Sequence, residues 1–125
     1  MAPRKKILVV DDDKTLQMIL KTAFEKAGYQ VIPALDAMQG LMMARQVKPD
    51  LVVLDMMMPA GGGQSVYERL QMMAGSFEVP VLIYSAMPPQ EIAKFIPEGP
   101  QIKVLNKSAT IAEVLAAAEA LLAGA

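Results

Sequence analysis

Two short apolar runs that each stop on acidic residues constrain the fold of this chain more than any other feature. Ile-Leu-Val-Val at 7–10 is followed directly by a run of three aspartates, and Leu-Val-Val-Leu at 51–54 is followed by Asp55. An apolar run without polar alternation is typical of a strand buried on both faces, as in a parallel sheet covered by helices. In such sheets ligands bind beyond the carboxyl ends of the strands. We therefore expect Asp11, Asp12 and Asp55 to lie together at one edge of the sheet.

Strand and helix patterns alternate along the whole chain. The expected strands are residues 6–10, 30–33, 51–54, 81–84 and 102–105. The expected helices are residues 14–27, a segment between Asp36 and Pro49, residues 64–74, about two turns between Pro89 and Pro97, and a last helix that starts with a capping box at Thr110. Five strand–helix units predict an α/β fold with a doubly wound, five-stranded parallel sheet, the flavodoxin-like (βα)5 arrangement. Nothing resembles a linker, so we expect a single domain over residues 1–125.

Several local features carry expectations of their own. The helical period places Leu16, Ile19, Leu20, Ala23 and Ala27 on the inward face of the first helix. Gly61-Gly62-Gly63 predicts a flexible loop before the third helix. The chain has 11 methionines, and at helix positions such as 18, 38, 42 and 72 we interpret them as flexible core residues rather than copper ligands.

The composition excludes several classes of function. The 125 residues include no cysteine and no histidine, so the chain forms no disulfide or zinc–thiolate site and cannot itself donate a phosphoryl group from histidine. Its net charge is −1 and its basic cluster is limited to Arg4-Lys5-Lys6, so we expect no nucleic-acid partner. No apolar run approaches the roughly 18 residues of a membrane span, and we expect a cytoplasmic protein without membrane insertion.

The carboxyl edge of the expected sheet collects a set of groups suited to phosphoryl transfer. Ser85 follows the fourth strand, and Lys107 follows the fifth. Together with the three aspartates they offer a nucleophile, donors for developing charge, and ligands for a cation. Clustered carboxylates need a cation, and a hard, oxygen-seeking ion such as Mg2+ is the expected one.

These residues resemble the response-regulator receiver domain, the phospho-acceptor module of two-component signalling, over essentially the whole chain. The shared marks are the acidic pair Asp11-Asp12 after the first strand, Asp55 after the third, Ser85 after the fourth and Lys107 after the fifth. The resemblance implies a stand-alone, single-domain response regulator. Each mark alone is weak, but all four in order at strand ends make a specific pattern.

The resemblance also implies roles for the acidic residues. Asp55 would accept a phosphoryl group from the phosphohistidine of a partner kinase. Asp12 would bind Mg2+ directly, Asp11 directly or through water, and the backbone carbonyl of Met57 would be a third protein ligand. The chain would then be no enzyme beyond catalysing its own phosphorylation and dephosphorylation.

The remaining implications concern the phosphoryl oxygens and the partners. Ser85 would bond one phosphoryl oxygen, and Lys107 would pair with another, since lysine is a mobile point charge for phosphate. The expected partners are a sensor histidine kinase or a phosphotransfer protein, and a downstream protein target.

The chain departs from the family pattern in ways that concern signal output and lifetime. Most members carry Tyr or Phe three residues before the lysine, where this chain has Val104, so the usual output switch is in doubt. The lysine is usually followed by a cis proline, but here Ser108 follows, so we expect a trans peptide. Met57 and Met87 occupy the positions that flank the attacking water, and two apolar side chains predict slow autodephosphorylation.

Two alternatives remain open. Residues 11–15 also fit the opening motif of haloacid-dehalogenase-type phosphatases, in which Asp11 would be the nucleophile and Asp13 the acid/base. That interpretation leaves Asp55 unexplained, and the acidic pair it needs after the lysine is found only within the last helix. The second alternative is a receiver-fold scaffold that binds partners independently of phosphorylation.

Overall fold

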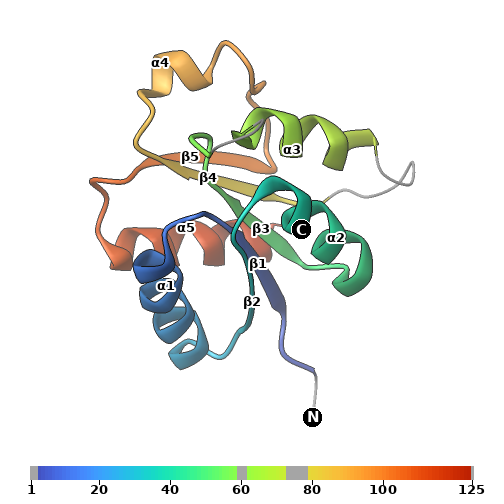
Figure 1. The fold of residues 1–125 in the computed structure, drawn as a ribbon. Coiled ribbons are helices and arrows are strands. Elements are labelled where there is room, and N and C mark those ends of the chain that lie inside the picture. Colours follow the sequence, from blue (N-terminus) through green and yellow to red (C-terminus); the bar gives the residue numbers. More distant parts are fainter. Residues whose placement is uncertain (1–2, 59–61, 73–78, 125) are drawn as a thin grey trace.

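Strands and helices alternate throughout the protein. The computed structural model describes residues 3–58, 62–72 and 79–124, which hold five strands and five helices (Figure 1). The strands are β1 (Lys6–Val10), β2 (Gln30–Ala34), β3 (Leu51–Leu54), β4 (Val81–Ser85) and β5 (Ile102–Asn106). The helices are α1 (Lys14–Lys26), α2 (Ala37–Val47), α3 (Gly62–Met72), α4 (Pro89–Ile92) and α5 (Ile111–Ala123).

The five strands form one parallel sheet in the order β2-β1-β3-β4-β5. Helices α1 and α5 cover one face of the sheet, and α2 and α3 cover the other (Figure 1). Strand order reverses beside β1, which is the arrangement of a doubly wound sheet. The fold class predicted from the apolar runs is therefore confirmed.

Burial on both faces explains why β1 contains no alternating polar residues. Ile7 and Val9 pack with α1 and α5 in one core cluster, whereas Leu8 and Val10 pack with α2, α3 and the segment after α4 in the other. All four side chains are at most 1% exposed. Consecutive side chains of a strand point to opposite faces, so an inner strand of this sheet needs apolar residues at every position.

The predicted inward face of α1 is partly wrong. The buried residues of this helix are Gln17, Leu20 and Phe24, while Ile19 is 45% exposed and Ala27 is exposed as well. Of the expected inward residues only Leu20 is fully buried. The helix presents Leu20 and Phe24 to the sheet, together with Gln17, a polar residue that hydrogen-bonds to backbone carbonyls at the sheet edge.

The triple glycine was expected to form a loop, but two of its members begin a helix. Gly62 and Gly63 are buried in the first turn of α3, and Gly61 lies outside the described residues. A Cβ at position 63 would collide with the carbonyl oxygen of Asp55 and come within 2.8 Å of the Cα of Met56. Glycine is needed here for close approach of two backbones, not for flexibility.

The methionine interpretation fails at the positions that were named as examples. Met18, Met38, Met42 and Met72 are 48–81% exposed on the outer faces of their helices, whereas Met56 and Met58 are buried after β3. Helical spacing does not by itself say which side of a helix faces the sheet.

The remaining boundaries differ slightly from the expected ones. Helix α4 has four residues, about one turn rather than two, and both Ser85 and Asn106 belong to their strands. The capping box of α5 is present, with Thr110 and Glu113 bonding each other's backbone N–H groups. The Lys107–Ser108 peptide is trans, as expected. Within the described residues, no helix is both long enough and apolar enough to cross a membrane.

Candidate functional site: an acidic cluster at the carboxyl edge

Three carboxylates meet at the carboxyl edge of the sheet. Asp11, Asp12 and Asp55 each place an oxygen within 4.8 Å of the others. Strands β1 and β3 pair so that Val10 lies beside Leu54, and the N–H of Asp55 donates to the carbonyl of Val10 at 3.0 Å. The next residue of each strand is therefore an aspartate at the same level. Asp11 and Asp55 are each only 3% exposed, whereas Asp12 is exposed to solvent.

The loop between β1 and α1 is fixed by hydrogen bonds that involve two of its three aspartates. The N–H of Asp13 donates to Oδ1 of Asp11 at 2.9 Å, and Oδ1 of Asp13 accepts from the N–H of Leu16 at 3.0 Å. Asp13 is thus the N-cap of α1. Asp12 is the exposed member of the three-carboxylate cluster, and Asp13 is not part of that cluster. The acid/base role that a phosphatase would assign to Asp13 gains no support from this placement.

Lys107 reaches the acidic cluster from the end of β5. Its Nζ lies 2.8 Å from Oδ2 of Asp11 and 3.6 Å from Oδ2 of Asp55. Burial raises the pKa of Asp11 above its usual value, although hydrogen bonds from Lys107 and Asp13 act in the opposite direction. Burial alone would lower the pKa of Lys107, but the hydrogen bond and charge of Asp11, aided by Asp55, raise it overall. Lys107 therefore stays protonated at neutral pH.

Both the carboxylate and the backbone carbonyl of Asp55 are contacted by neighbouring backbone groups. The N–H of Met57 donates to Oδ1 of Asp55 at 3.1 Å, which orients the carboxylate toward the cluster. On the other side, Gly63 in the first turn of α3 lies against the Asp55 carbonyl, with its N–H donating to the carbonyl of Met56 at 3.3 Å. Sequence reasoning missed these glycines as part of the site. The available signal was a glycine run between a strand-end aspartate and a helix.

Ser85 lies at the same edge and is completely buried. Its Oγ accepts a hydrogen bond from the N–H of Met87 at 3.2 Å, and its carbonyl accepts from the N–H of Lys107 at 3.0 Å. Ser85 at the end of β4 thus hydrogen-bonds both to the turn after β4 and to the residue that follows β5. All the site residues predicted from the sequence lie at one edge of the sheet. Met57 is 56% exposed there, and its backbone N–H donates to Asp55.

The donor set suits a hard divalent cation. Three carboxylates offer oxygen ligands, two of them are buried, and the single ammonium of Lys107 leaves the cluster with excess negative charge. Buried carboxylates without compensating charge are unfavourable, and oxygen-rich sites of this kind favour Mg2+ or Ca2+ over softer metals. The cluster could therefore hold a metal ion.

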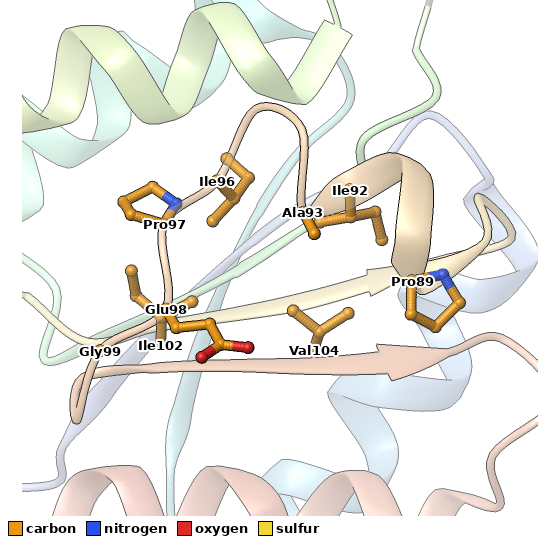
Figure 2. Close-up of a pocket in the computed structure, with 9 residues that line it drawn as sticks. All are labelled: Pro89, Ile92, Ala93, Ile96, Pro97, Glu98, Gly99, Ile102 and Val104. Carbon is orange, nitrogen blue, oxygen red and sulfur yellow. The ribbon is translucent and has the colours of Figure 1, made fainter.

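A groove lies between α4, the segment after it and β5. Residues of α4 and of the segment after it face the edge strand β5 across an apolar groove of about 670 Å3 (Figure 2). Ile92 and Ile96 point toward the strand that carries Ile102 and Val104, and Glu98 also lines the groove (Figure 2). Val104 is 38% exposed. Because α4 has only one turn, it leaves this part of β5 uncovered.

Comparisons with known proteins agree with the observed fold and also identify the family of the chain. The sequence matches the response regulator receiver domain family over residues 7–119. It is 37% identical over 82 residues to the DNA-binding dual master transcriptional regulator RpaA of a Synechocystis species, which covers 66% of this chain and 34% of that protein. It is 33% identical over 120 residues to the virulence factors putative positive transcription regulator BvgA of Bordetella pertussis, covering 95% of this chain and 56% of that protein. The chain thus spans about a third to about half the length of these relatives.

Among solved structures, a response regulator receiver domain protein (CheY-like) from Methanospirillum hungatei superimposes with a TM-score of 0.86. The two sequences are 22% identical, and the match covers 98% of this chain and 96% of that one, so it shows the shared fold. The family match covers most of the strands and helices described above, including every strand end that carries a site residue. This chain belongs to the response regulator receiver domain family, the receiver modules of two-component systems.

Proposed function

We propose that the chain is a phospho-acceptor that takes a phosphoryl group onto Asp55 from a histidine kinase or phosphotransfer protein. The observation that carries this proposal is the burial of Asp55 beside Asp11, with Lys107 within 3.6 Å of its carboxylate. A carboxylate oxygen of Asp55 would attack the phosphorus of a phosphohistidine, the P–N bond would break, and an acyl phosphate would form. Beyond its own phosphorylation and dephosphorylation, the chain would catalyse no reaction.

The same proposal assigns the cation to Mg2+. Asp11 and Asp12 would hold it through carboxylate oxygens, with the backbone carbonyl of Met57 as a third protein ligand. The hydrogen bond from the Met57 N–H to Asp55 supports this, because it fixes that peptide beside the cluster. Mg2+ keeps several waters and takes one or two carboxylates plus phosphate oxygens, and when bound it neutralises charge on the phosphoryl group.

Lys107 and Ser85 would serve the phosphoryl oxygens. Lys107 now donates to Asp11, so it would exchange that carboxylate for a phosphoryl oxygen as the cluster becomes neutralised. The Ser85 hydroxyl would donate to another oxygen, since its Oγ is already oriented by the N–H of Met87. Met57 and Met87 would leave the attacking water without a polar partner, so the acyl phosphate would be long-lived.

A downstream protein would bind the groove between α4 and β5. The exposed Val104 and the apolar side chains opposite it support this choice (Figure 2). We infer that residues 1–125 are one receiver domain, working in the cytoplasm without contacting nucleic acid or entering a membrane. The curated relatives are regulators of transcription with longer chains, and the DNA binding named for RpaA is not carried over to this receiver domain.

One observation favours a second candidate, a scaffold that binds partners independently of phosphorylation. Val104 stands where an aromatic residue would swing between two positions, and its short branched side chain has no comparable motion. The groove would then have one form whether or not Asp55 is phosphorylated.

The test is incubation with acetyl phosphate, or with beryllium fluoride, in the presence of Mg2+. We expect intact mass to show addition of one phosphoryl group, and NMR to show shifts at the carboxyl edge, both absent in Asp55→Asn. Shifts that extend to the α4–β5 groove would favour the switch. Shifts confined to the edge would favour the scaffold, and an unmodified wild-type protein would overturn the phospho-acceptor proposal.

A further inference from the structure

Gln17 is a polar residue buried under the acidic edge. It lies on the face of α1 that packs on the sheet, and it is only 6% exposed. Its Nε2 lies 2.9 Å from the carbonyl oxygen of Val9, 3.1 Å from that of Asp11 and 3.0 Å from that of Ala34. One side-chain amide therefore serves three backbone acceptors at the carboxyl ends of β1 and β2.

The pattern of donors and acceptors shows what this position requires. A side-chain NH2 group has two hydrogens, so the three carbonyls share them. The amide atom that faces the carbonyls must be the nitrogen, because the amide oxygen would be repelled by three acceptors. Oε1 of Gln17 is buried and has no hydrogen-bond partner among the residues that the structure describes. An unsatisfied buried oxygen is unfavourable. An apolar residue of similar length would avoid it but leave three carbonyls without this donor.

Two of the three carbonyls involve the backbone of Asp11 directly. The N–H of Asp11 donates to the carbonyl of Ala34 at 3.0 Å, and that same carbonyl also accepts from Gln17. The carbonyl of Asp11 accepts from Gln17 directly. Gln17 thus bonds the carbonyl of Asp11 directly and also bonds the Ala34 carbonyl that holds the Asp11 N–H. The Asp11 carboxylate accepts from Lys107 and from the N–H of Asp13.

We propose that Gln17 is a positioning residue for the cation site. By holding the backbone of Asp11, it sets the place at which the Asp11 carboxylate, and the adjoining Asp12, meet Mg2+. This inference rests on the proposed function, since it assigns Gln17 a part in the same Mg2+ site. Residues that orient the direct ligands of a metal typically change its affinity 10- to 100-fold, in order of magnitude, when they are replaced.

A purely structural role is the competing explanation. Gln17 also attaches α1 to the sheet, so its loss will lower stability whatever happens at the cluster. The two roles differ in their effect on Mg2+ affinity at equal stability. A core residue at the opposite end of α1 provides the matched comparison, because Phe24 is fully buried and lies in the core cluster away from the acidic edge.

The experiment measures the Mg2+ dissociation constant by calorimetry, and unfolding by urea, for the wild type and two variants. Gln17→Met keeps the length and removes the donors, and Phe24→Leu lowers stability at a distance. We expect Gln17→Met to weaken Mg2+ binding by about tenfold or more. We expect Phe24→Leu to stay within about twofold of the wild type.

Amide exchange in metal-free protein supplies a second readout. The Asp11 N–H should exchange faster in Gln17→Met than in Phe24→Leu, relative to the global stability of each variant. Equal Mg2+ constants for Gln17→Met and Phe24→Leu would overturn the positioning role and leave the phospho-acceptor proposal standing. A wild-type protein that binds no Mg2+ would instead overturn both, and the two failures are therefore distinguishable.

Discussion

Replacing Lys107 with methionine should tighten Mg2+ binding while removing a donor for the phosphoryl group. In the present structure the ammonium occupies the cluster as a competing cation, 2.8 Å from Asp11 and 3.6 Å from Asp55. A divalent ion that binds there must displace or repel this charge. Lys107→Met removes that competition and leaves the three carboxylates in place.

The size of the effect follows from distance and exposure. Two unit charges 4 Å apart interact by about 4 kcal/mol at an effective dielectric constant of 20. The Lys107 side chain is 25% exposed and can turn toward solvent when the metal arrives, so only part of this repulsion persists. We take about 1 kcal/mol as the remaining penalty, which corresponds to roughly fivefold in affinity.

The assay is calorimetric titration of Mg2+ at neutral pH, at low and at physiological ionic strength. Lys103→Met is the matched control, because Lys103 is an exposed lysine within β5, the strand that ends just before Lys107. We expect Lys107→Met to lower the dissociation constant about fivefold, with a larger change at low salt, and Lys103→Met to leave it nearly unchanged. A Lys107→Met protein that binds Mg2+ no better than the control would refute the competition argument.

Three further predictions concern the same edge of the sheet. Gly63→Ala should lower the free energy of unfolding by about 1–3 kcal/mol, because the added Cβ would collide with the Asp55 carbonyl. In the control Gly124→Ala the added Cβ meets only ordinary contacts, so the free energy of unfolding measured in urea should change by less than about 0.5 kcal/mol. Because burial raises the pKa of Asp11, its contribution to folding is fully present below its usual pKa of 3.8 and is lost as pH rises through the raised value. Asp11→Asn should therefore stabilise the metal-free protein at neutral pH, and urea unfolding from pH 3 to 7 that shows no widening gap between the two proteins would contradict this. If the acyl phosphate forms, Met57→Asn combined with Met87→Glu should shorten its lifetime by about tenfold or more, because polar groups can orient the attacking water. Phosphate release from this variant that is no faster than from the wild type would contradict the prediction that the two methionines slow hydrolysis.

Much of the candidate site was predictable because strand ends in a parallel sheet obey a simple rule. The apolar runs at 7–10 and 51–54 marked inner strands, and the residues that follow such strands must meet at one edge. The cap of the last helix was equally readable, since the hydroxyl of Thr110 accepts from the backbone N–H of Glu113 in the first turn. These features depend on neighbours in the sequence, or on a strand order that few topologies allow.

Other features depended on packing between distant segments. Helical period does not fix the rotation of α1: Gln17 faces three backbone carbonyls at the sheet edge, and Ile19 is half-exposed. The glycines before α3 were expected to be flexible, but the approach of the helix to the Asp55 backbone leaves no room for a Cβ.

The sequence alone therefore determined which residues stand at the ends of the strands, and with them the chemistry available at the edge. Only the tertiary structure decided how those residues are used in the folded chain. Lys107 lies 96 residues from Asp11 and contacts it only because β5 completes the sheet. The hydrophobic period and the composition of a segment predict its local secondary structure. The burial of a charge, the rotation of a helix and the close approach of two backbones depend on the packing of the whole domain.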